Sequence, residues 1–312
     1  MKEQPVIFAI PSYKPLGERI AKLTGYKQGE LELQTFPDGE KYVRILDKMQ
    51  MRDAVVIGGT INDESTLELY DLAYGLAAAG CRQLTLAVPF FGYSTMERAA
   101  RPGEVVTAKA RARLLSSIPR TPLGNKIALL DLHSEGLPYY FEDDVTPTHL
   151  YAKPVVLEAV KELGGKSLVL ASTDAGRAKW VESLANEAGV DAAFIIKRRL
   201  SGSATQVRAV SADVKGRDVV IYDDMIRTGG SVLKAAEAYK AAGAREISLI
   251  ATHGLFTDDA LAKFKASGLI KRVVCTDSHP NALAANEPAF LKISSIDGVF
   301  AQFLKSVHSG AS

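Results

Sequence analysis

Two segments of the chain, residues 52–91 and 217–256, follow the same order of residue types. Each contains a short run rich in β-branched residues, a polar loop, an amphipathic stretch that ends in Ala-Ala-Gly, and a second apolar run. This order predicts strand, loop, helix and strand, with Gly80 and Gly243 at the helix C-termini. A parallel strand pair joined by a right-handed helical crossover is the expected result, so the predicted fold class is α/β.

Further strand-like runs alternate with helix-like runs along the chain, at 126–132, 167–172, 192–196 and 272–275. They predict a mostly parallel sheet flanked by helices in each half. The length of 312 residues also suits two domains. We place the boundary near 146–153, which gives an N-terminal domain over 1–148 and a C-terminal domain over 149–312.

The overall composition excludes several classes of protein. The 38 basic and 36 acidic residues leave a net charge of +2, which does not indicate a nucleic-acid-binding face. No apolar stretch reaches 18 residues, so no membrane span is expected. The cysteines, Cys81 and Cys275, lie far apart and fit no disulfide or metal-ligand spacing. We therefore expect two core thiols in a reduced, cytoplasmic protein.

Residues 219–231, VVIYDDMIRTGGS, form the most informative motif. An apolar strand that ends near Ile221 would present two acids at its carboxyl end, where ligands gather in such sheets. The Thr-Gly-Gly-Ser turn then opens a helix whose N–H groups can receive a phosphate. We expect the acids to face ribose hydroxyls and the turn to hold a 5-phosphate. The candidate residues for this site are Asp223, Asp224, Arg227, Thr228, Gly229, Gly230 and Ser231.

The alternative interpretation of this motif is an exposed Asp-Asp loop followed by an ordinary helix cap. The acids follow four apolar residues directly, which favours the ligand site. The first copy of the repeat has Gly58-Gly59-Thr60-Ile61-Asn62-Asp63 in the corresponding loop. Only the second half is therefore predicted to hold a phosphorylated sugar.

The motif closely resembles the phosphoribosyl diphosphate site of type I phosphoribosyltransferases and of phosphoribosyl diphosphate synthetases. Four further segments occur in the order and spacing of the latter family, the ribose-phosphate diphosphokinases: residues 36–40, 131–133, 172–176 and 197–199. The resemblance runs from about Ile7 to Phe303. It implies two duplicated type I phosphoribosyltransferase-like domains.

The resemblance also assigns the nucleotide side of the site. It implies that Phe36, Asp38 and Glu40 reach the nucleotide of a neighbouring subunit, so that the protein is a homo-oligomer. The chain departs from the common family pattern over 94–98, where Thr95 and Met96 replace an Arg and a Gln. The sequence of this region is similar to that of the plant-type, phosphate-independent class, which implies that nucleotides other than ATP also serve as diphosphoryl donors. The expected nucleotide residues here are Thr95, Met96, Glu97 and Arg98.

The remaining family positions concern the metal and the transferred group. His133 and Asp174 match the residues that place Mg²⁺ and the nucleotide phosphates, and His133 is also a candidate catalytic residue. Lys197 and Arg199 match the residues of a flexible catalytic loop that closes over the phosphates. Without the resemblance, a lone His would be a core or capping residue, and a basic cluster a solvated edge.

The implied activity is transfer of the diphosphoryl group of Mg-ATP to the 1-hydroxyl of ribose 5-phosphate, which gives phosphoribosyl diphosphate and AMP. Three alternatives stay open. One is a non-catalytic regulatory homologue that binds ribose phosphates. Another is a phosphoribosyltransferase, for which the chain shows no nucleobase-binding segment. The third, a plain nucleotide-binding α/β protein without chemistry, fits least.

Overall fold

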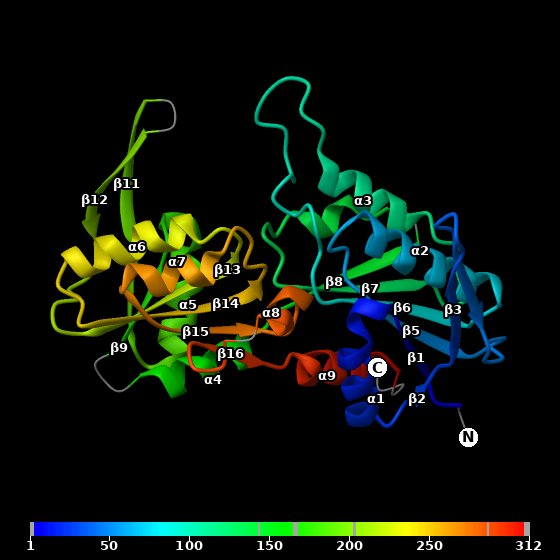
Figure 1. Cartoon of the computed structure of the whole chain (residues 1–312). Helices are drawn as coiled ribbons and strands as arrows, with labels where there is room; N and C mark the ends of the chain where they lie inside the picture. Colours follow the sequence, from blue (N-terminus) through cyan, green and yellow to red (C-terminus); the bar gives the residue numbers. More distant parts are fainter. Residues whose placement is uncertain (1–2, 143, 165–167, 202–203, 286, 309–312) are drawn as a thin grey trace. The chain divides into compact units, whose positions relative to one another are not determined.

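The computed structural model describes residues 3–308 apart from 143, 165–167, 202–203 and 286, and it describes residues 197–201 and 204–209 by their backbone alone. The described chain divides into two compact units (Figure 1). Unit 1 contains the residues up to Tyr151 together with those from Asp297 onward, and unit 2 is Ala152–Ile296. The end of the chain thus differs from the expected 149–312 domain, because the last helix packs with unit 1.

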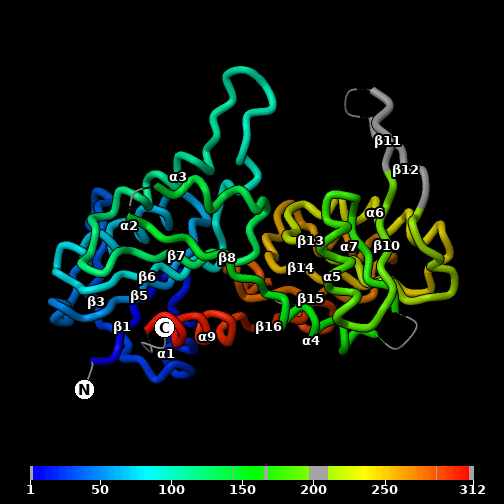
Figure 2. Tube along the Cα trace, turned by 180° about the vertical axis from the view of Figure 1, so that it is seen from behind, coloured from blue at the N-terminus to red at the C-terminus, as the bar shows by residue number. Residues whose placement is uncertain are grey.

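Over the described residues, unit 1 is built on a six-stranded sheet in the order β2-β1-β5-β6-β7-β8, and every pair is parallel. Its strands are β1 Val6–Ala9, β2 Lys27–Gln28, β5 Asp53–Ile57, β6 Gln83–Val88, β7 Asn125–Leu130 and β8 Val145–Leu150. The helices are α1 Lys14–Thr24, α2 Asp63–Ala78, α3 Thr107–Ser116 and α9 Asp297–His308, with 3₁₀ turns η1 Pro11–Tyr13 and η2 Leu137–Tyr140. α9 contacts α1, as Figure 2 shows from behind.

Unit 2 repeats this plan with a six-stranded, fully parallel sheet in the order β10-β9-β13-β14-β15-β16 among the described residues. Its strands are β9 Leu168–Ser172, β10 Asp191–Ala193, β13 Asp218–Ile226, β14 Glu246–Gly254, β15 Ile270–Thr276 and β16 Leu291–Ser294. The helices are α4 Lys153–Leu163, α5 Ala178–Ala188, α6 Gly230–Ala241, α7 Ala260–Ser267 and α8 Pro280–Ala284, with the 3₁₀ turn η3 Ala175–Arg177. The predicted α/β class with two mostly parallel sheets is confirmed.

Each unit also carries an antiparallel hairpin between the second and third strands of its sheet in chain order. In unit 1 the hairpin consists of β3 Leu31–Thr35 and β4 Lys41–Ile45. In unit 2 it consists of β11 Ile195–Ser201 and β12 Ala204–Val210. The duplication therefore extends beyond the two segments in which the sequence displays it.

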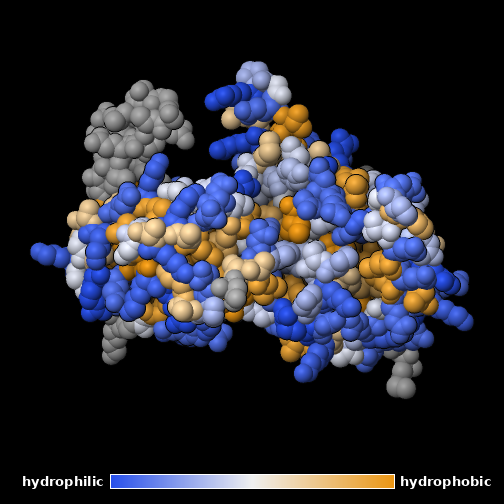
Figure 3. Space-filling model, in the orientation of Figure 1, coloured by the Kyte–Doolittle hydropathy of each residue, from blue (hydrophilic) through white to orange (hydrophobic). Residues whose placement is uncertain are grey.

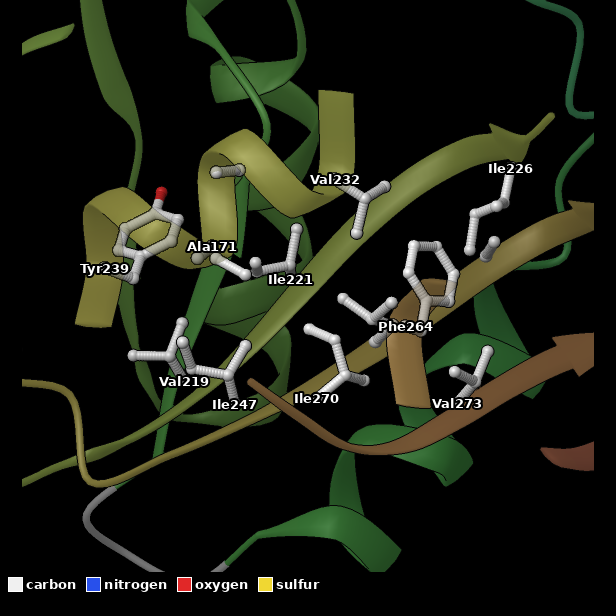
Figure 4. Close-up of a cluster of buried hydrophobic side chains, with 14 of the residues drawn as sticks. Ala171, Val219, Ile221, Ile226, Val232, Tyr239, Ile247, Phe264, Ile270 and Val273 are labelled. Atoms are coloured by element: carbon white, nitrogen blue, oxygen red, sulfur yellow. The ribbon is translucent and has the colours of Figure 1, made fainter. Parts of the chain in front are cut away.

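The core of unit 2 lies between its sheet and helices α6 and α7 (Figure 4). Val219 and Ile221 of β13 alternate with residues that face the other side of the sheet, as a strand covered on both faces requires. Val232 and Tyr239 of α6 and Phe264 of α7 close this side, and all five side chains are at most 3% exposed. Helices α4 and α5 contact β14 and β9. The sheet thus holds the start of α6 in a fixed place at the end of β13.

The two expected core thiols, Cys81 and Cys275, are both buried and free in the described chain. None of the described helices is long and apolar enough to cross a membrane.

An Asp-Arg pair stands at the same place in both copies of the repeat. Arg82 donates from Nε and a terminal nitrogen to the two carboxylate oxygens of Asp53, at 2.8 and 2.7 Å. Arg245 holds Asp218 in the same two-fold manner, at 2.8 and 2.5 Å. Each pair joins the beginnings of two neighbouring strands. In the first pair Asp53 is buried and Arg82 is partly exposed, and His308 of α9 lies 3.4 Å from Asp53; the second pair is exposed.

The environment of Asp53 determines its ionisation. Burial alone would raise the pKa of this carboxyl, but hydrogen bonds from His308 and Arg82, with the charge of Arg82, hold the pKa well below its ordinary value. A carboxylate whose pKa is lower in the folded chain stabilises the fold above the unfolded value of about 3.9. That stabilisation is lost as the pH falls further toward the folded pKa.

We predict that Asp53→Asn lowers the free energy of unfolding by about 3 kcal/mol at neutral pH, because it removes a buried carboxylate that Arg82 and His308 hydrogen-bond. The matched change Asp218→Asn breaks an exposed pair and should cost under about 1 kcal/mol. Urea denaturation at pH 7 and at about pH 3.5 measures both, and the cost of Asp53→Asn should shrink at the lower pH. Equal costs for the two variants at pH 7 would contradict the role given to burial.

Candidate functional site

The acid pair lies inside strand β13, two and three residues before its end, and not in a loop after Ile221 as the sequence predicted. The neighbouring strand β9 ends where Ser172 pairs with Tyr222. On its other side β13 continues to pair with β14 as far as Ile226. Pairing with β14 therefore extends the strand, and its acids face the loop that follows β9.

The two acids have different surroundings. Asp223 is partly exposed; its Oδ2 lies 3.3 Å from the Thr173 hydroxyl, which donates to it, and its Oδ1 accepts from the Asp224 backbone N–H at 3.0 Å. Asp224 is 3% exposed, and its Oδ2 lies 2.6 Å from a terminal nitrogen of Arg177. Burial and the charge of Asp224 raise the pKa of Asp223, while Arg177 lowers it. A hydroxyl donor or a cation at this place would favour the charged form.

The turn after β13 is held from one side by backbone hydrogen bonds. Ile226 O accepts from the N–H groups of Leu255 and Phe256, at 2.9 and 3.1 Å. Arg227 O accepts from Thr257 N at 3.1 Å. Thr228, Gly230 and Ser231 are exposed, so the first turn of α6 is open to solvent.

The adjacent glycines 229 and 230 have different surroundings. Gly229 has φ +78°, and a Cβ there would lie 2.4 Å from the ring of Phe264, so both its backbone conformation and the core require glycine. A Cβ at Gly230 would have Thr228 Oγ1 as its nearest neighbour, at 3.9 Å. Gly229 is thus explained by the fold, whereas Gly230 leaves its backbone open for a reason that packing does not supply.

The corresponding helix of unit 1, α2, begins in the opposite way. Asn62 accepts from Ser65 N at 2.8 Å, and Ser65 Oγ accepts from Asn62 N, which forms a capping box. Asp63 and Glu64 add negative charge in the first turn. At α6, neither a side-chain cap nor a first-turn acid occurs among the described residues. A helix N-terminus favours anions. The N-terminus of α2 has its own acidic side chains, whereas that of α6 can receive an anion from outside the chain.

Asp174 lies in the loop after β9, at the same edge of unit 2 as the acid pair. Its side chain accepts from Gly176 N at 2.9 Å and caps η3, which ends at Arg177. Through Thr173 and Arg177 this loop contacts both acids of β13. The structure therefore brings Asp174, the acid pair and the turn together in one unit.

The basic residues Lys197 and Arg199 belong to strand β11 and not to a loop, which corrects the sequence interpretation. Their backbones pair with Val207 and Thr205 of β12, because the residues after the cluster form a second strand. The two side chains lie outside the described part of the chain. Strand β11 contacts η3, which places this hairpin next to the loop that carries Asp174.

His133 lies in unit 1, where it follows β7 and is exposed. The loop before it is fixed by two hydrogen bonds: Asp131 N donates to Leu150 O at 2.9 Å, and Leu132 N donates to His149 Nε2 at 2.9 Å. His149, which carries no role in the sequence analysis, thus positions the His133 loop. Sequence reasoning missed Arg177 and included Thr173 only as part of the 172–176 segment, although both lie within three residues of Asp174, in a strand-end loop where ligand-binding residues gather.

Phe36, Asp38 and Glu40 lie in the turn between β3 and β4, and all are exposed. The turn is closed by hydrogen bonds from Phe36 N to Glu40 O and from Gly39 N to Phe36 O, at 2.8 and 2.9 Å. Beneath the hairpin lies a cavity of about 630 Å³, bordered by β3, β4, α2 and the end of β1. Figure 3 shows apolar patches among charged side chains on this side of unit 1.

Thr95, Met96, Glu97 and Arg98 lie in the long segment between β6 and α3. Met96 N donates to Tyr93 O at 2.8 Å, and the Tyr140 hydroxyl donates to Glu97 O. Arg98 pairs with Glu97 at 3.5 Å and is exposed, and Met96 is 44% exposed. Backbone contacts therefore fix the path of the segment, and two of its side chains face solvent.

No group of three or more His, Cys, Asp or Glu side chains that could hold a metal occurs in the described part of the chain. The partly exposed carboxylates of Asp174 and Asp223 are the oxygen ligands that Mg²⁺ prefers, beside water and phosphate oxygens.

Comparison with protein families gives two matches. Residues 5–118 match the N-terminal domain of ribose phosphate pyrophosphokinase, and residues 181–312 match the phosphoribosyl synthetase-associated domain. Together they cover most of both units.

Individual relatives agree over nearly the whole chain. A ribose-phosphate pyrophosphokinase of Fusobacterium nucleatum is 31% identical, over 98% of this chain and 96% of the relative. One from Vibrio cholerae is 33% identical over 87% of this chain and 86% of the relative. The crystal structure of phosphoribosylpyrophosphate synthetase from Mycobacterium smegmatis superposes with a TM-score of 0.86, at 25% identity, and covers 99% of this chain and 100% of that one. The chain therefore belongs to the ribose-phosphate pyrophosphokinase family and is an enzyme of that type.

Proposed function

We propose that the protein transfers the β,γ-diphosphoryl group of Mg-ATP to the 1-hydroxyl of ribose 5-phosphate. The ribose oxygen forms a bond to the β-phosphorus, the bond from that phosphorus to the oxygen bridging to the α-phosphorus breaks, and AMP leaves. The hydroxyl proton passes to solvent. The observation that carries the proposal is the contrast between α2, which caps its own N-terminus, and α6, which follows an acid pair and is open.

The ribose 5-phosphate site in this proposal is confined to unit 2. Asp223 and Asp224 orient the ribose hydroxyls, and the turn from Arg227 to Ser231 holds the 5-phosphate at the start of α6. The open backbone at Gly230 supports this assignment, since a phosphate oxygen can approach it without meeting a side chain.

The nucleotide side of the proposal requires Mg²⁺. His133 and Asp174 would hold the metal with the nucleotide phosphates, and the bound metal would withdraw charge from their oxygens. His133 is also proposed to act in catalysis. Thr95, Met96, Glu97 and Arg98 would contact the nucleotide. With Thr95 and Met96 in place of charged and amide side chains, GTP, CTP or UTP should also serve as donors.

Lys197 and Arg199 are proposed to neutralise charge that develops on the transferring phosphates. The contact of β11 with η3 supports this role, because it places their strand beside the loop of Asp174. The same residues argue against a non-catalytic homologue, which would not need them. A phosphoribosyltransferase is disfavoured because unit 1 would then have no function.

A homo-oligomer in the cytoplasm completes the proposal. Phe36, Asp38 and Glu40 would contact the nucleotide of a neighbouring subunit. The exposed aromatic and aliphatic side chains of their hairpin, Leu33, Phe36, Tyr42 and Leu46, are 36–48% exposed and suit burial against a partner. Light scattering coupled to gel filtration measures the assembly.

The first test is the product ratio. Purified protein with Mg²⁺, ribose 5-phosphate and ATP should give AMP and phosphoribosyl diphosphate in equal amounts, because one bond transfer produces both. Phosphorus NMR identifies the products, and the same assay with GTP, CTP and UTP tests donor choice. Formation of ADP in place of AMP would refute the proposed reaction.

The second test replaces the open glycine. Gly230→Ala should raise the KM for ribose 5-phosphate about tenfold or more, because the methyl group occupies the approach to the backbone, while stability stays equal or rises by up to about 1 kcal/mol. The matched control is Gly298→Ala in the first turn of α9, where a Cβ would meet none of the described atoms within 4 Å. This change should leave the KM for ribose 5-phosphate unchanged. An unchanged KM in folded Gly230→Ala would remove the phosphate assignment.

The third test compares alanine at three consecutive positions of β11. Positions 197 and 199 share one face of the hairpin and position 198 the other, since strand residues alternate and no register shift falls between them. Lys197→Ala and Arg199→Ala should each lower kcat by a few hundredfold, about 3–4 kcal/mol, with little change in either KM. Arg198→Ala is the control. Equal small effects at all three positions would support a solvated strand edge.

A further inference from the structure

The ion pair between Arg177 and Asp224 links the loop after β9 to strand β13 at the strand-end edge of unit 2. Arg177 is the last residue of η3, and Asp224 belongs to β13. Their charged atoms lie 2.6 Å apart, with side chains 23% and 4% exposed. We propose that Arg177 is a positioning residue that holds the Asp224 carboxylate in place for the ribose hydroxyls. This inference rests on the proposed function.

The charge balance of the site gives the first argument. Asp223 and Asp224 are adjacent in sequence, and Asp224 is buried. Two neighbouring carboxylates repel each other, and burial adds a cost for each charge. Arg177 forms an ion pair with Asp224, and its positive charge offsets part of the negative charge of the two acids. Without Arg177 the Asp224 carboxylate would lose the partner that fixes its orientation, and a rotated carboxylate would offer its acceptors differently to a ribose hydroxyl.

The construction of η3 gives the second argument. The turn is a single one, capped at its start by Asp174 and ended by Arg177. Thr173, just before it, donates to Asp223. The loop after β9 therefore holds both acids of β13, one through a hydroxyl and the other through a guanidinium. Such a loop fixes the two carboxylates relative to each other before a ligand arrives, which reduces the cost of binding.

The same unit provides a matched control for Arg177. Arg217 pairs with Asp191 at the same distance of 2.6 Å, and its side chain is 25% exposed, close to the 23% of Arg177. Arg217 comes just before β13, at the opposite end of that strand from the acid pair. The two pairs differ in their acids, since Asp191 is 67% exposed and Asp224 is 4% exposed, so the control matches the arginine and not its partner. In folded Arg177→Gln, a rise confined to the KM for ribose 5-phosphate is therefore what separates positioning from general destabilisation.

The experiment measures the KM for ribose 5-phosphate, the KM for ATP and kcat in the full-length protein. Arg177→Gln should raise the KM for ribose 5-phosphate about tenfold or more and change the KM for ATP less than about twofold. Arg177→Lys should recover part of the loss, because it restores the charge. Arg217→Gln should leave both KM values within about twofold of the original chain.

A double-mutant cycle with Asp224→Asn shows whether Arg177 acts through Asp224. If it does, adding Arg177→Gln to Asp224→Asn should change the KM for ribose 5-phosphate by less than about twofold. The double variant also removes both charges together, so it should fold even where Arg177→Gln alone does not. Full additivity would overturn the inference, since Arg177 would then act independently of Asp224. An unchanged KM in folded Arg177→Gln would overturn it as well.

The outcome is separable from that of the proposed function. If the original chain neither binds ribose 5-phosphate nor forms phosphoribosyl diphosphate, the proposed function fails and takes the inference with it. If the original chain is active and Arg177→Gln is equally active with both substrates, the inference alone fails.

Discussion

Parallel pairing is the constraint on which the rest of this structure depends. Because every strand pair in the two six-stranded sheets of the described chain is parallel, the strand beginnings gather at one edge of each sheet and the strand ends at the other. The Asp53–Arg82 and Asp218–Arg245 pairs lie at the first kind of edge and join neighbouring strands. The acid pair of β13 and the start of α6 lie at the second kind. In β13 the ion pair with Arg245 and the acid pair therefore lie at opposite ends of one strand.

The duplication gave the two units the same plan, and local side chains then made them different. At the end of β5 the loop of unit 1 is filled from within: a Cβ at Gly59 would lie 2.4 Å from the Tyr13 hydroxyl, and Thr60 is fully buried, where it accepts from Gly92 N at 2.7 Å. The corresponding end of β13 carries acids and an exposed turn. One copy thus uses its strand end for packing, and the other keeps it accessible.

The sequence predicted the class of the fold and the strand, loop, helix and strand repeat, because both depend on local periodicity. It misplaced features that depend on distant partners. β13 extends to Ile226 because β14 lies beside it, and residues 197–199 form a strand because β12 pairs with them. The packing of α9 in unit 1, where His308 contacts Asp53, likewise could not be predicted, because no local sequence pattern indicates it. Arg177 was missed for the same reason, since its partner lies 47 positions away in the sequence.

The two glycines of the turn show why a motif alone does not separate folding from function. Both belong to the same Thr-Gly-Gly-Ser pattern, and a family resemblance gives them one common role. In the structure Gly229 is required by a positive φ and by the ring of Phe264, conditions that hold with or without a ligand. Gly230 meets neither condition, so its hydrogen side chain has no explanation in the packing of unit 2. The 5-phosphate that we propose at α6 would explain it, because a helix N-terminus attracts an anion and a methyl group would stand in the way of the anion.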